Sequence, residues 1–239
     1  MTLKESLDSI GNRVKAAAAR TGRNPADVTI VAITKQVDWQ TIGKLNELNW
    51  RDIGENRVTD ALDKARLLPG NRFTWHMVGH LQTNKVKKAL ALFDFIHSLA
   101  SLNLAEAIQK EADKAGKKIK TLIEVNVSGE ASKSGIRPED LLDFYNKSKA
   151  MITGDSAGKM VISGLMTMAP IADNPESVRP YFRRLKELMD ELRNNIKEED
   201  ASENLKYLSM GMSQDFEVAV EEGANMVRIG TAIFDPFRN

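Results

Sequence analysis

Lys35 is the first residue of this sequence whose chemistry stands out. It follows, with one residue between, the almost unbroken apolar run VTIVAI at 28–33. A lysine at the end of a buried strand can form a Schiff base with a carbonyl compound, if a nearby cation helps to keep its amine neutral. Arg228 is the candidate cation. Taken alone, Lys35 is better explained as a lysine whose stem is buried and whose ammonium reaches solvent.

Hydroxyl and glycine residues follow two further strand-like runs near the C-terminus, LSMGM and NMVRIG. Hydroxyls donate to phosphate oxygens, and glycines let backbone N–H groups approach them closely. The four residues are Ser209, Ser213, Gly230 and Thr231. Ser213 also fits the N-cap of the following helix, whose N-terminus would attract an anion. Singly, each residue is better explained as a cap or a turn, but the set predicts a phosphate site.

The elements that must position these residues alternate along the chain. β-rich runs occur at 28–33, 50–54, 73–79, 93–98, 119–127, 160–168, 206–212 and 225–230. Helical patterns separate them. One begins after Ser101, a good cap, and ends at Gly116. Another, at 175–195, has one apolar face, with Pro180 in its first turns. The polar stretch 153–159 is expected to be a surface loop.

Eight strands, seven intervening helices and a leading N-terminal helix predict an α/β fold, a single (β/α)8 TIM barrel over residues 1–239. The alternative is a doubly wound open sheet. The lack of a glycine-rich dinucleotide turn after the first strand counts against it. In a barrel, the strand ends share one mouth, and the loops after strands seven and eight often bind phosphate. A Schiff-base lysine in that mouth fits an aldehyde that carries a phosphate, of which pyridoxal 5′-phosphate (PLP) is the commonest cofactor.

Composition excludes several classes of protein. The net charge is +1, so no basic field for nucleic acid exists, and without cysteine there are no disulfides or thiolate metal sites. The three histidines lack metal-ligand spacing. Leu3, Leu7, Ile10 and Val14 recur at helical spacing, unlike a signal peptide, and no segment is apolar enough to cross a bilayer. We expect a cytoplasmic protein, and a monomer, because the polar helix faces are typical of solvated surfaces.

The sequence resembles the pyridoxal phosphate homeostasis proteins, which are similar in fold to the N-terminal barrel of alanine racemase. The resemblance covers nearly the whole chain in order. Its motifs are VAITKQV, RDIGENRV, WHMVGHLQTNK, IEVNVSGEASKSG, ISGLMTMAP and LSMGMSQDFEVAVEEGANMVRIGTAIF. The last block and WHMVGHLQTNK are the most specific. Asp38 departs from the pattern, since many relatives have proline there.

The resemblance implies a role for each candidate residue. Lys35 would hold PLP as a Schiff base, and Arg228 would face the pyridine nitrogen. Asn56 and Met166 would border the ring. The phosphate would lie among Ser209, Ser213, Gly230 and Thr231. No catalytic residue and no metal ligand is assigned.

The resemblance also implies a function. The family is regarded as carrying or buffering PLP in vitamin B6 homeostasis, with PLP and the apo forms of PLP enzymes as partners. The alternatives are a racemase-like PLP enzyme and a Schiff-base aldolase that acts on a phosphorylated sugar. Racemases of this type use a tyrosine from a second, C-terminal domain of a partner subunit. That domain is expected to be absent here, because the sequence ends nine residues after Gly230.

Overall fold

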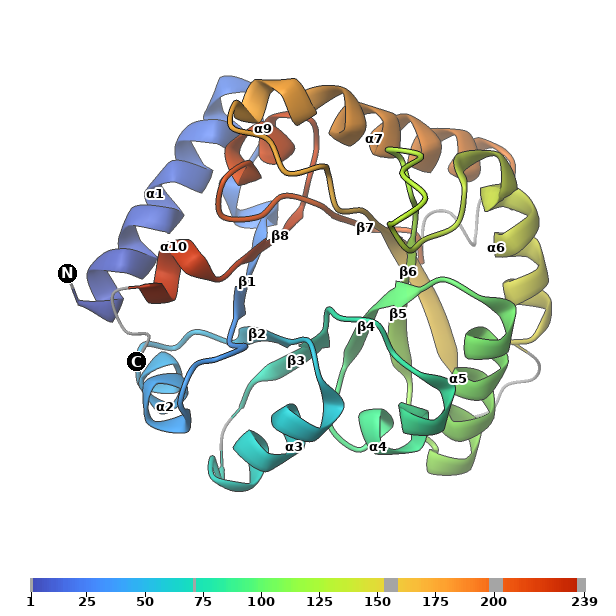
Figure 1. Ribbon diagram of the computed structural model, residues 1–239, viewed down its shortest axis with the longest axis horizontal. Coiled ribbons are helices and arrows are strands. Elements are labelled where there is room, and N and C mark those ends of the chain that lie inside the picture. The colour runs from blue at the N-terminus through green and yellow to red at the C-terminus, as the bar shows by residue number, and fades with distance from the viewer. Residues whose placement is uncertain (1, 71, 153–158, 198–203, 236–239) are drawn as a thin grey trace.

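Eight parallel strands close into a barrel in the order β1-β2-β3-β4-β5-β6-β7-β8 (Figure 1). The computed structural model describes residues 2–70, 72–152, 159–197 and 204–235. The strands are β1 Thr29–Ile33, β2 Asp52–Glu55, β3 Thr74–Met77, β4 Phe95–Leu99, β5 Ile119–Glu124, β6 Met160–Met166, β7 Tyr207–Ser209 and β8 Met226–Ile229. The predicted TIM barrel is confirmed, and the open-sheet alternative is wrong, because β8 pairs with β1.

Helices surround the barrel and connect each strand to the next (Figure 1). They are α1 Leu3–Arg20, α2 Trp39–Glu47, α3 Val58–Arg66, α4 Val86–Leu90, α5 Leu102–Ala115, α6 Leu141–Ala150, α7 Arg179–Asn194, α9 Phe216–Glu221 and α10 Thr231–Phe234. Short 3-10 turns lie at Pro25–Asp27, Thr83–Lys85, Pro138–Asp140 and Pro175–Val178. No helix in the described ranges is both long enough and apolar enough to span a membrane.

The two helices predicted in most detail form as their sequences indicate. Ser101 caps α5 by accepting a hydrogen bond from the Leu104 N–H, and Gly116 ends the helix with φ 61°. The helix expected from residue 175 instead begins as a 3-10 turn, and α7 starts at Arg179, with Pro180 in its first turn. Proline fits there because the first N–H groups of a helix have no partner within the helix. The loop expected at 153–159 lies outside the described residues, except for Lys159.

Several predicted strands are shorter than expected at their C-terminal ends, and β7 shows why. The apolar pattern runs to Met212, but the strand stops at Ser209. Gly211 has φ 94°, and a Cβ there would lie 2.6 Å from the Ala219 Cβ. The chain therefore turns sharply under α9, and only glycine allows that turn. The turn directs residues 212–215 toward the barrel mouth.

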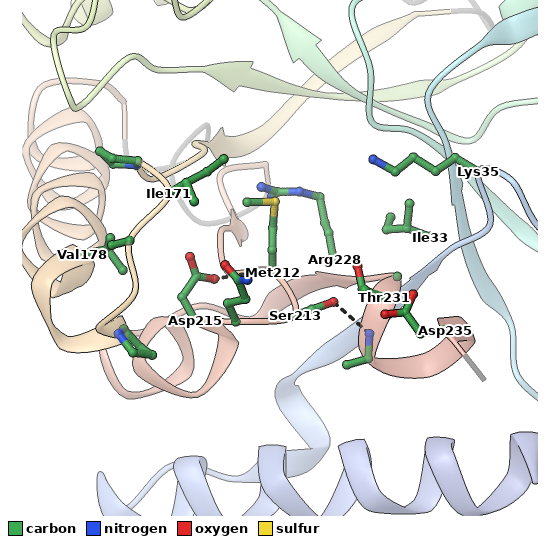
Figure 2. Close-up of a pocket in the computed structure, with 16 residues that line it drawn as sticks. Ile33, Lys35, Ile171, Val178, Met212, Ser213, Asp215, Arg228, Thr231 and Asp235 are labelled. Atoms are coloured by element: carbon green, nitrogen blue, oxygen red, sulfur yellow. Dashed lines mark hydrogen bonds between the residues drawn. The ribbon is translucent and has the colours of Figure 1, made fainter. Parts of the chain in front are cut away.

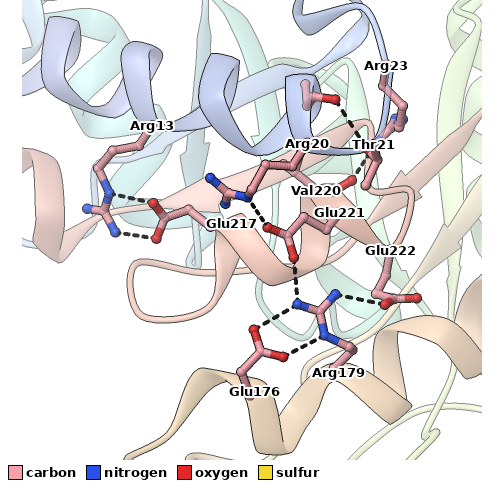
Figure 3. Close-up of polar contacts among 11 residues, drawn as sticks. Arg13, Arg20, Thr21, Arg23, Glu176, Arg179, Glu217, Val220, Glu221 and Glu222 are labelled. Atoms are coloured by element: carbon pink, nitrogen blue, oxygen red, sulfur yellow. Dashed lines mark hydrogen bonds and ion pairs between the residues drawn. The ribbon is translucent and has the colours of Figure 1, made fainter.

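Ion pairs tie α1 and α7 to α9, the helix that follows this turn (Figure 3). Arg13 in α1 forms a two-point pair with Glu217, whose shorter contact is 2.9 Å, and Arg20 pairs with Glu221. Arg179 at the start of α7 also contacts Glu221. Each exposed pair contributes only about 0–1 kcal/mol, but a shared network orders all three helices together. The segment before α9 is thereby held against the barrel.

The inside of the barrel is filled mainly by apolar side chains. They are Val31, Ile33, Phe95, Leu122, Met166 and Met226, with Val78 and Tyr207 packed against them. A larger apolar layer lies between the sheet and the helices. Side chains alternate between these two layers along each strand, so Lys120 and Glu124 face inward with Leu122. An inward-facing polar side chain therefore lies either at one of the two open ends of the barrel or among the apolar side chains of its interior.

Candidate functional site

A cavity of about 500 Å³ opens at the C-terminal ends of β1, β6, β7 and β8 (Figure 2). Its lining comes from β1 and the following turn, the loop after β6, residues 212–215, and the end of β8 with α10. The residues are Ile33, Lys35, Pro170, Ile171, Ala172, Pro175, Val178, Met212, Ser213, Gln214, Asp215, Arg228, Gly230, Thr231, Ala232 and Asp235. Ligand cavities usually have volumes of about 300–1,000 Å³. Five of the eight predicted site residues meet here.

Lys35 projects from the end of β1 into this cavity (Figure 2). Its side chain is exposed, and it makes no hydrogen bond or ion pair with any residue that the structure describes. The backbone turns immediately afterwards, because Gln36 has φ 64°, a conformation that costs a non-glycine residue about 1–2 kcal/mol. Asp38 then caps α2 by accepting from the Thr41 N–H at 2.8 Å. The amine is therefore presented on a short, well-anchored turn.

A buried ion pair anchors the residue just before Lys35. The Lys64 ammonium donates to the Thr34 carbonyl oxygen at 2.8 Å and to Glu55 Oε1 at 2.7 Å. The Thr34 hydroxyl donates to the same carboxylate oxygen at 2.7 Å. Since Glu55 is fully buried, its carboxylate requires these donors. Glu55 therefore fixes the backbone that carries Lys35.

Arg228 lies on β8 with only 5% of its surface exposed, and its guanidinium faces the cavity. It donates from Nη1 to the Ser209 hydroxyl oxygen at 2.7 Å and from Nη2 to the Thr167 carbonyl oxygen at 2.9 Å. Burial lowers the pKa of Arg228 to about 10, while the charges of Asp215 and Glu124 oppose that shift. The guanidinium thus remains protonated at neutral pH. It is both charged and held in one orientation.

Ser213 lines the cavity but does not cap the helix that follows it, so that prediction is wrong. The helix α9 begins at Phe216, with Asp215 as its N-cap residue. The Gly211 turn instead brings Ser213 against α10, where its hydroxyl oxygen accepts from the Ala232 N–H at 3.2 Å. The hydroxyl proton has no acceptor in the part of the chain that the structure describes. A donor is therefore available to a ligand.

Gly230 and Thr231 adjoin Ser213 at the start of α10. Thr231 is exposed, and Gly230 packs on β1 so closely that a Cβ would lie 3.3 Å from the Ile33 Cβ. Only a minimal side chain fits comfortably between the two strand ends. Two hydroxyl groups and a glycine backbone thus line the same cavity as Lys35, and the phosphate site that the pattern indicates there stays a prediction.

Three predicted site residues lie outside the lining of this cavity. Ser209 is fully buried beneath Arg228. Met166 is 1% exposed and packs inside the barrel with Ile33, which does line the cavity. Asn56 follows β2 and is half-buried, and its backbone is so close to Gly79 that a Cβ on that glycine would lie 2.4 Å from the Asn56 carbonyl oxygen.

The loop after β6 forms the apolar wall that the sequence did not single out by residue. Pro170 and Ile171 follow the predicted strand at 160–168, and Ile171 is 93% exposed (Figure 2). The signal for this wall in the sequence is an isoleucine directly before the polar stretch ADNPES at 172–177. Asp215 was also missed as a lining residue. Its carboxylate accepts from the Met212 N–H at 2.6 Å, and burial raises its pKa.

Comparison with known proteins gives consistent matches over the whole chain. The family model for the N-terminal domain of alanine racemase matches residues 6–236. Proteins named pyridoxal phosphate homeostasis protein from Aquifex aeolicus and Pseudomonas aeruginosa are 41% and 34% identical. Each alignment covers 98% of this chain, and it covers 98% and 95%, respectively, of the relative.

Solved structures agree with these sequence matches. An unknown protein from Bifidobacterium adolescentis superposes with a TM-score of 0.86 at 32% identity, over 97% of this chain and 94% of that one. PipY of Synechococcus elongatus, with PLP bound, gives 0.76 at 31% identity, over 93% and 99%. Alanine racemase of Clostridium difficile, at 16% identity and 0.71, shares the fold alone and is covered over 56% of its length.

Proposed function

Because the chain belongs to the pyridoxal phosphate homeostasis proteins, within the alanine racemase N-terminal domain family, we propose that it binds PLP and carries or buffers it in vitamin B6 homeostasis. One observation carries the proposal: the Lys35 amine has no partner among the described residues and lies in the same cavity as hydroxyl groups and a buried arginine. The PLP-bound structure of PipY, a relative with the same fold, supports it.

Lys35 is the residue that would attach the cofactor. When bound, PLP supplies an aldehyde that condenses with a primary amine to form a Schiff base. Lys35 suits this task because its amine is exposed to the cavity and not engaged by a carboxylate. The Glu55–Lys64 pair keeps the preceding residue in place, so the amine is presented without a rearrangement of β1.

Ser213, Gly230 and Thr231 would bind the phosphate. The Ser213 hydroxyl already accepts from the backbone of α10, which leaves its proton to be donated to an anion. Thr231 offers a second exposed hydroxyl, and Gly230 keeps the strand end open. Hydrogen bonds to charged groups contribute roughly 1.5–3 kcal/mol each, so this part of the site would supply much of the affinity.

Arg228 would face the pyridine nitrogen. A protonated guanidinium has donors only, so it favours an unprotonated ring nitrogen. We propose that Ser209 contributes through Arg228, which it contacts, and not through the phosphate. Met166 would support the ring from behind Ile33, and Asn56 would border it from the β2 side.

A carrier role accounts for the exposure of the site better than an enzymatic one. Lys35 and Thr231 are open to solvent, so the cofactor could enter and leave. We propose apo forms of PLP enzymes as recipients, the cytoplasm as the location and a monomer as the active form. Transfer of PLP to a purified apo-enzyme, cell fractionation and light scattering test these three points in turn.

The test of the site is borohydride reduction of the protein after incubation with PLP, followed by peptide mapping. We expect the label on Lys35 and loss of visible imine absorbance in Lys35→Ala. Lys44→Ala, which removes an exposed lysine from α2, is the matched control and should retain both signals. A label found chiefly on another lysine would reject the assignment, and no imine absorbance from the unmodified protein would reject the Schiff base itself.

A further inference from the structure

Polar side chains form a continuous row of hydrogen bonds through the apolar interior of the barrel. From Arg228, the Ser209 hydroxyl lies 2.7 Å from Nη1, and the same hydroxyl lies 3.0 Å from His97 Nδ1. His97 Nε2 lies 3.0 Å from His76 Nδ1, and His76 Nε2 lies 3.0 Å from Asp52 Oδ1. We call these five residues the interior network. It begins at the cavity and ends at the opposite, N-terminal end of the barrel.

Most residues of the interior network are almost completely buried, so each of their hydrogen bonds affects stability. Ser209, His97 and His76 have no exposed surface, whereas the Asp52 side chain is 29% exposed. The His76 ring stacks on Phe95, with ring centroids 4.6 Å apart. Polar groups in such surroundings are costly unless each one is hydrogen-bonded, and here both nitrogens of both rings have a partner. The arrangement is a built feature of the barrel.

The positions of the protons follow from the two ends. An ionised Asp52 carboxylate only accepts, so a His76 ring with a single proton carries it on Nε2 and accepts at Nδ1. His97 must then donate from Nε2 and accept at Nδ1 from the Ser209 hydroxyl. Ser209 is left to accept from Arg228, which only donates. All four hydrogen bonds run in one direction, from Arg228 to Asp52.

Each ring carries a single proton in this arrangement, and the electrostatics of His97 agree. Burial lowers the pKa of His97 well below its ordinary value, and the charge of Arg228 acts in the same direction. A second cation beside the buried guanidinium is therefore avoided. Ser209 keeps an acceptor for its own proton, so its oxygen stays directed at Arg228.

We propose that Asp52, His76, His97 and Ser209 are positioning residues, which hold the Arg228 guanidinium in its orientation at the cavity from the far end of the barrel. The inference rests on the proposed function, in which Arg228 faces the cofactor ring. It adds a dependence of the site on Asp52, a residue that the cofactor would never touch. Ser209 and the Thr167 carbonyl each take one donor, and together they define the plane of the guanidinium.

The first test needs no cofactor. The sequence contains only three histidines, so ¹⁵N-histidine labelling resolves each imidazole by NMR. We expect His76 and His97 to be neutral at pH 7, with the proton on Nε2. Asp52→Ala should change the ¹⁵N chemical shifts of the His97 ring, although the two residues do not touch. Asp52→Asn, whose Oδ1 still accepts, should return these chemical shifts to the values of the unmodified protein.

Asp94→Ala is the matched control. Asp94 also lies at the N-terminal end of the barrel, but its carboxylate accepts from the Trp75 backbone N–H. This variant should leave the His97 signals unchanged. Three results would each overturn the proposal. They are a proton on Nδ1 of either ring, a charged ring at pH 7, and His97 signals that are the same in Asp52→Ala as in the unmodified protein.

The second test measures the site itself. Asp52→Ala should weaken PLP binding roughly 3- to 10-fold, about the effect of one hydrogen bond, and shift the visible absorbance of the bound cofactor. Asp52→Asn should bind as the unmodified protein does. If the unmodified protein and Asp52→Ala have the same affinity and spectrum, the positioning role is rejected while the proposed function stands. If the unmodified protein binds no PLP, the proposed function fails, and the NMR result alone decides whether the interior network is ordered as described.

Discussion

Arg228 donates a hydrogen bond to the hydroxyl oxygen of Ser209 at 2.7 Å, and Ser209 itself is fully buried. Ser213, four positions later, lines the cavity, and its hydroxyl proton has no acceptor within the described ranges. The two serines therefore have different tasks: one orients the guanidinium and the other faces the cavity. This separation supports our proposal that Ser213, and not Ser209, belongs with the phosphate site.

We predict that Ser213→Ala lowers the affinity for PLP roughly 10-fold or more and leaves the affinity for pyridoxal unchanged, because it removes a donor to a charged phosphate. Ser209→Ala should lower both affinities by the same factor, because its effect passes through Arg228 to the ring. Absorbance titration with both ligands measures the ratio. A Ser209→Ala variant that changes the PLP-to-pyridoxal ratio as Ser213→Ala does would contradict the assignment.

Glu124 should make stability depend on pH. Burial raises the pKa of this carboxyl above 4.5, against the hydrogen bond from Ser134 and the charge of Arg228. An acid with a raised folded-state pKa holds its proton more tightly in the folded state than in the unfolded state. Its contribution to stability is therefore lost as pH rises through the window that begins near 4.5.

Urea unfolding from pH 4 upward tests this on Glu124→Gln, which keeps an oxygen to accept from Ser134. The free energy of unfolding of the unmodified protein, relative to this variant, should fall as pH rises. A difference that stays constant or grows with pH would show that the carboxylate is stabilised, not penalised, in the barrel.

Gly164→Ala should destabilise the barrel severely. A Cβ at this position on β6 would lie 1.9 Å from the backbone oxygen of Tyr207 on the neighbouring strand, and backbone in a closed barrel cannot move away. We expect a loss of roughly 3 kcal/mol or more in urea unfolding. Gly11→Ala is the control: it lies within α1 with no atom nearby, and it should stabilise by about 0.5–1 kcal/mol. Equal effects would refute the packing argument.

We predict that the PLP-loaded protein does not racemise alanine efficiently. Racemisation needs acid/base groups on both faces of the α-carbon, and Lys35 serves one face at most. Tyr145 and Tyr181 lie in α6 and α7, and Tyr207 begins β7, so no tyrosine lines the described cavity. A protonated Arg228 also makes the ring a poorer electron sink.

The measurement is α-proton exchange and D-alanine formation from L-alanine in deuterated water. Turnover that depends on Lys35 and reaches about 1 per second or faster, an ordinary enzyme rate, would falsify the carrier role. Such turnover would favour the racemase-like enzyme instead. Lys35→Ala provides the background rate.

Much of the site follows from the sequence because a parallel barrel brings all strand ends to one mouth. Once β1 and β8 are recognised, Lys35, Arg228, Gly230 and Thr231 must meet. The apolar wall after β6 was not predictable in the same way. Its position depends on how a loop folds over the mouth, and loop geometry is not encoded by periodicity.

The sequence by itself determined the eight strands, the order of the helices and the residues that follow each strand, because these depend on local patterns of apolar and turn-forming residues. Only the tertiary structure decided that Ser209 lies beneath Arg228, that Ser213 contacts α10 instead of capping α9, and that His97 and His76 connect Arg228 to Asp52. Most of these contacts join side chains from consecutive strands or their loops, and the contact between His97 on β4 and Ser209 on β7 crosses the barrel interior. The stagger of the strands around the closed barrel decides which inward-facing side chains lie at the same height along the barrel axis. No single strand carries that information.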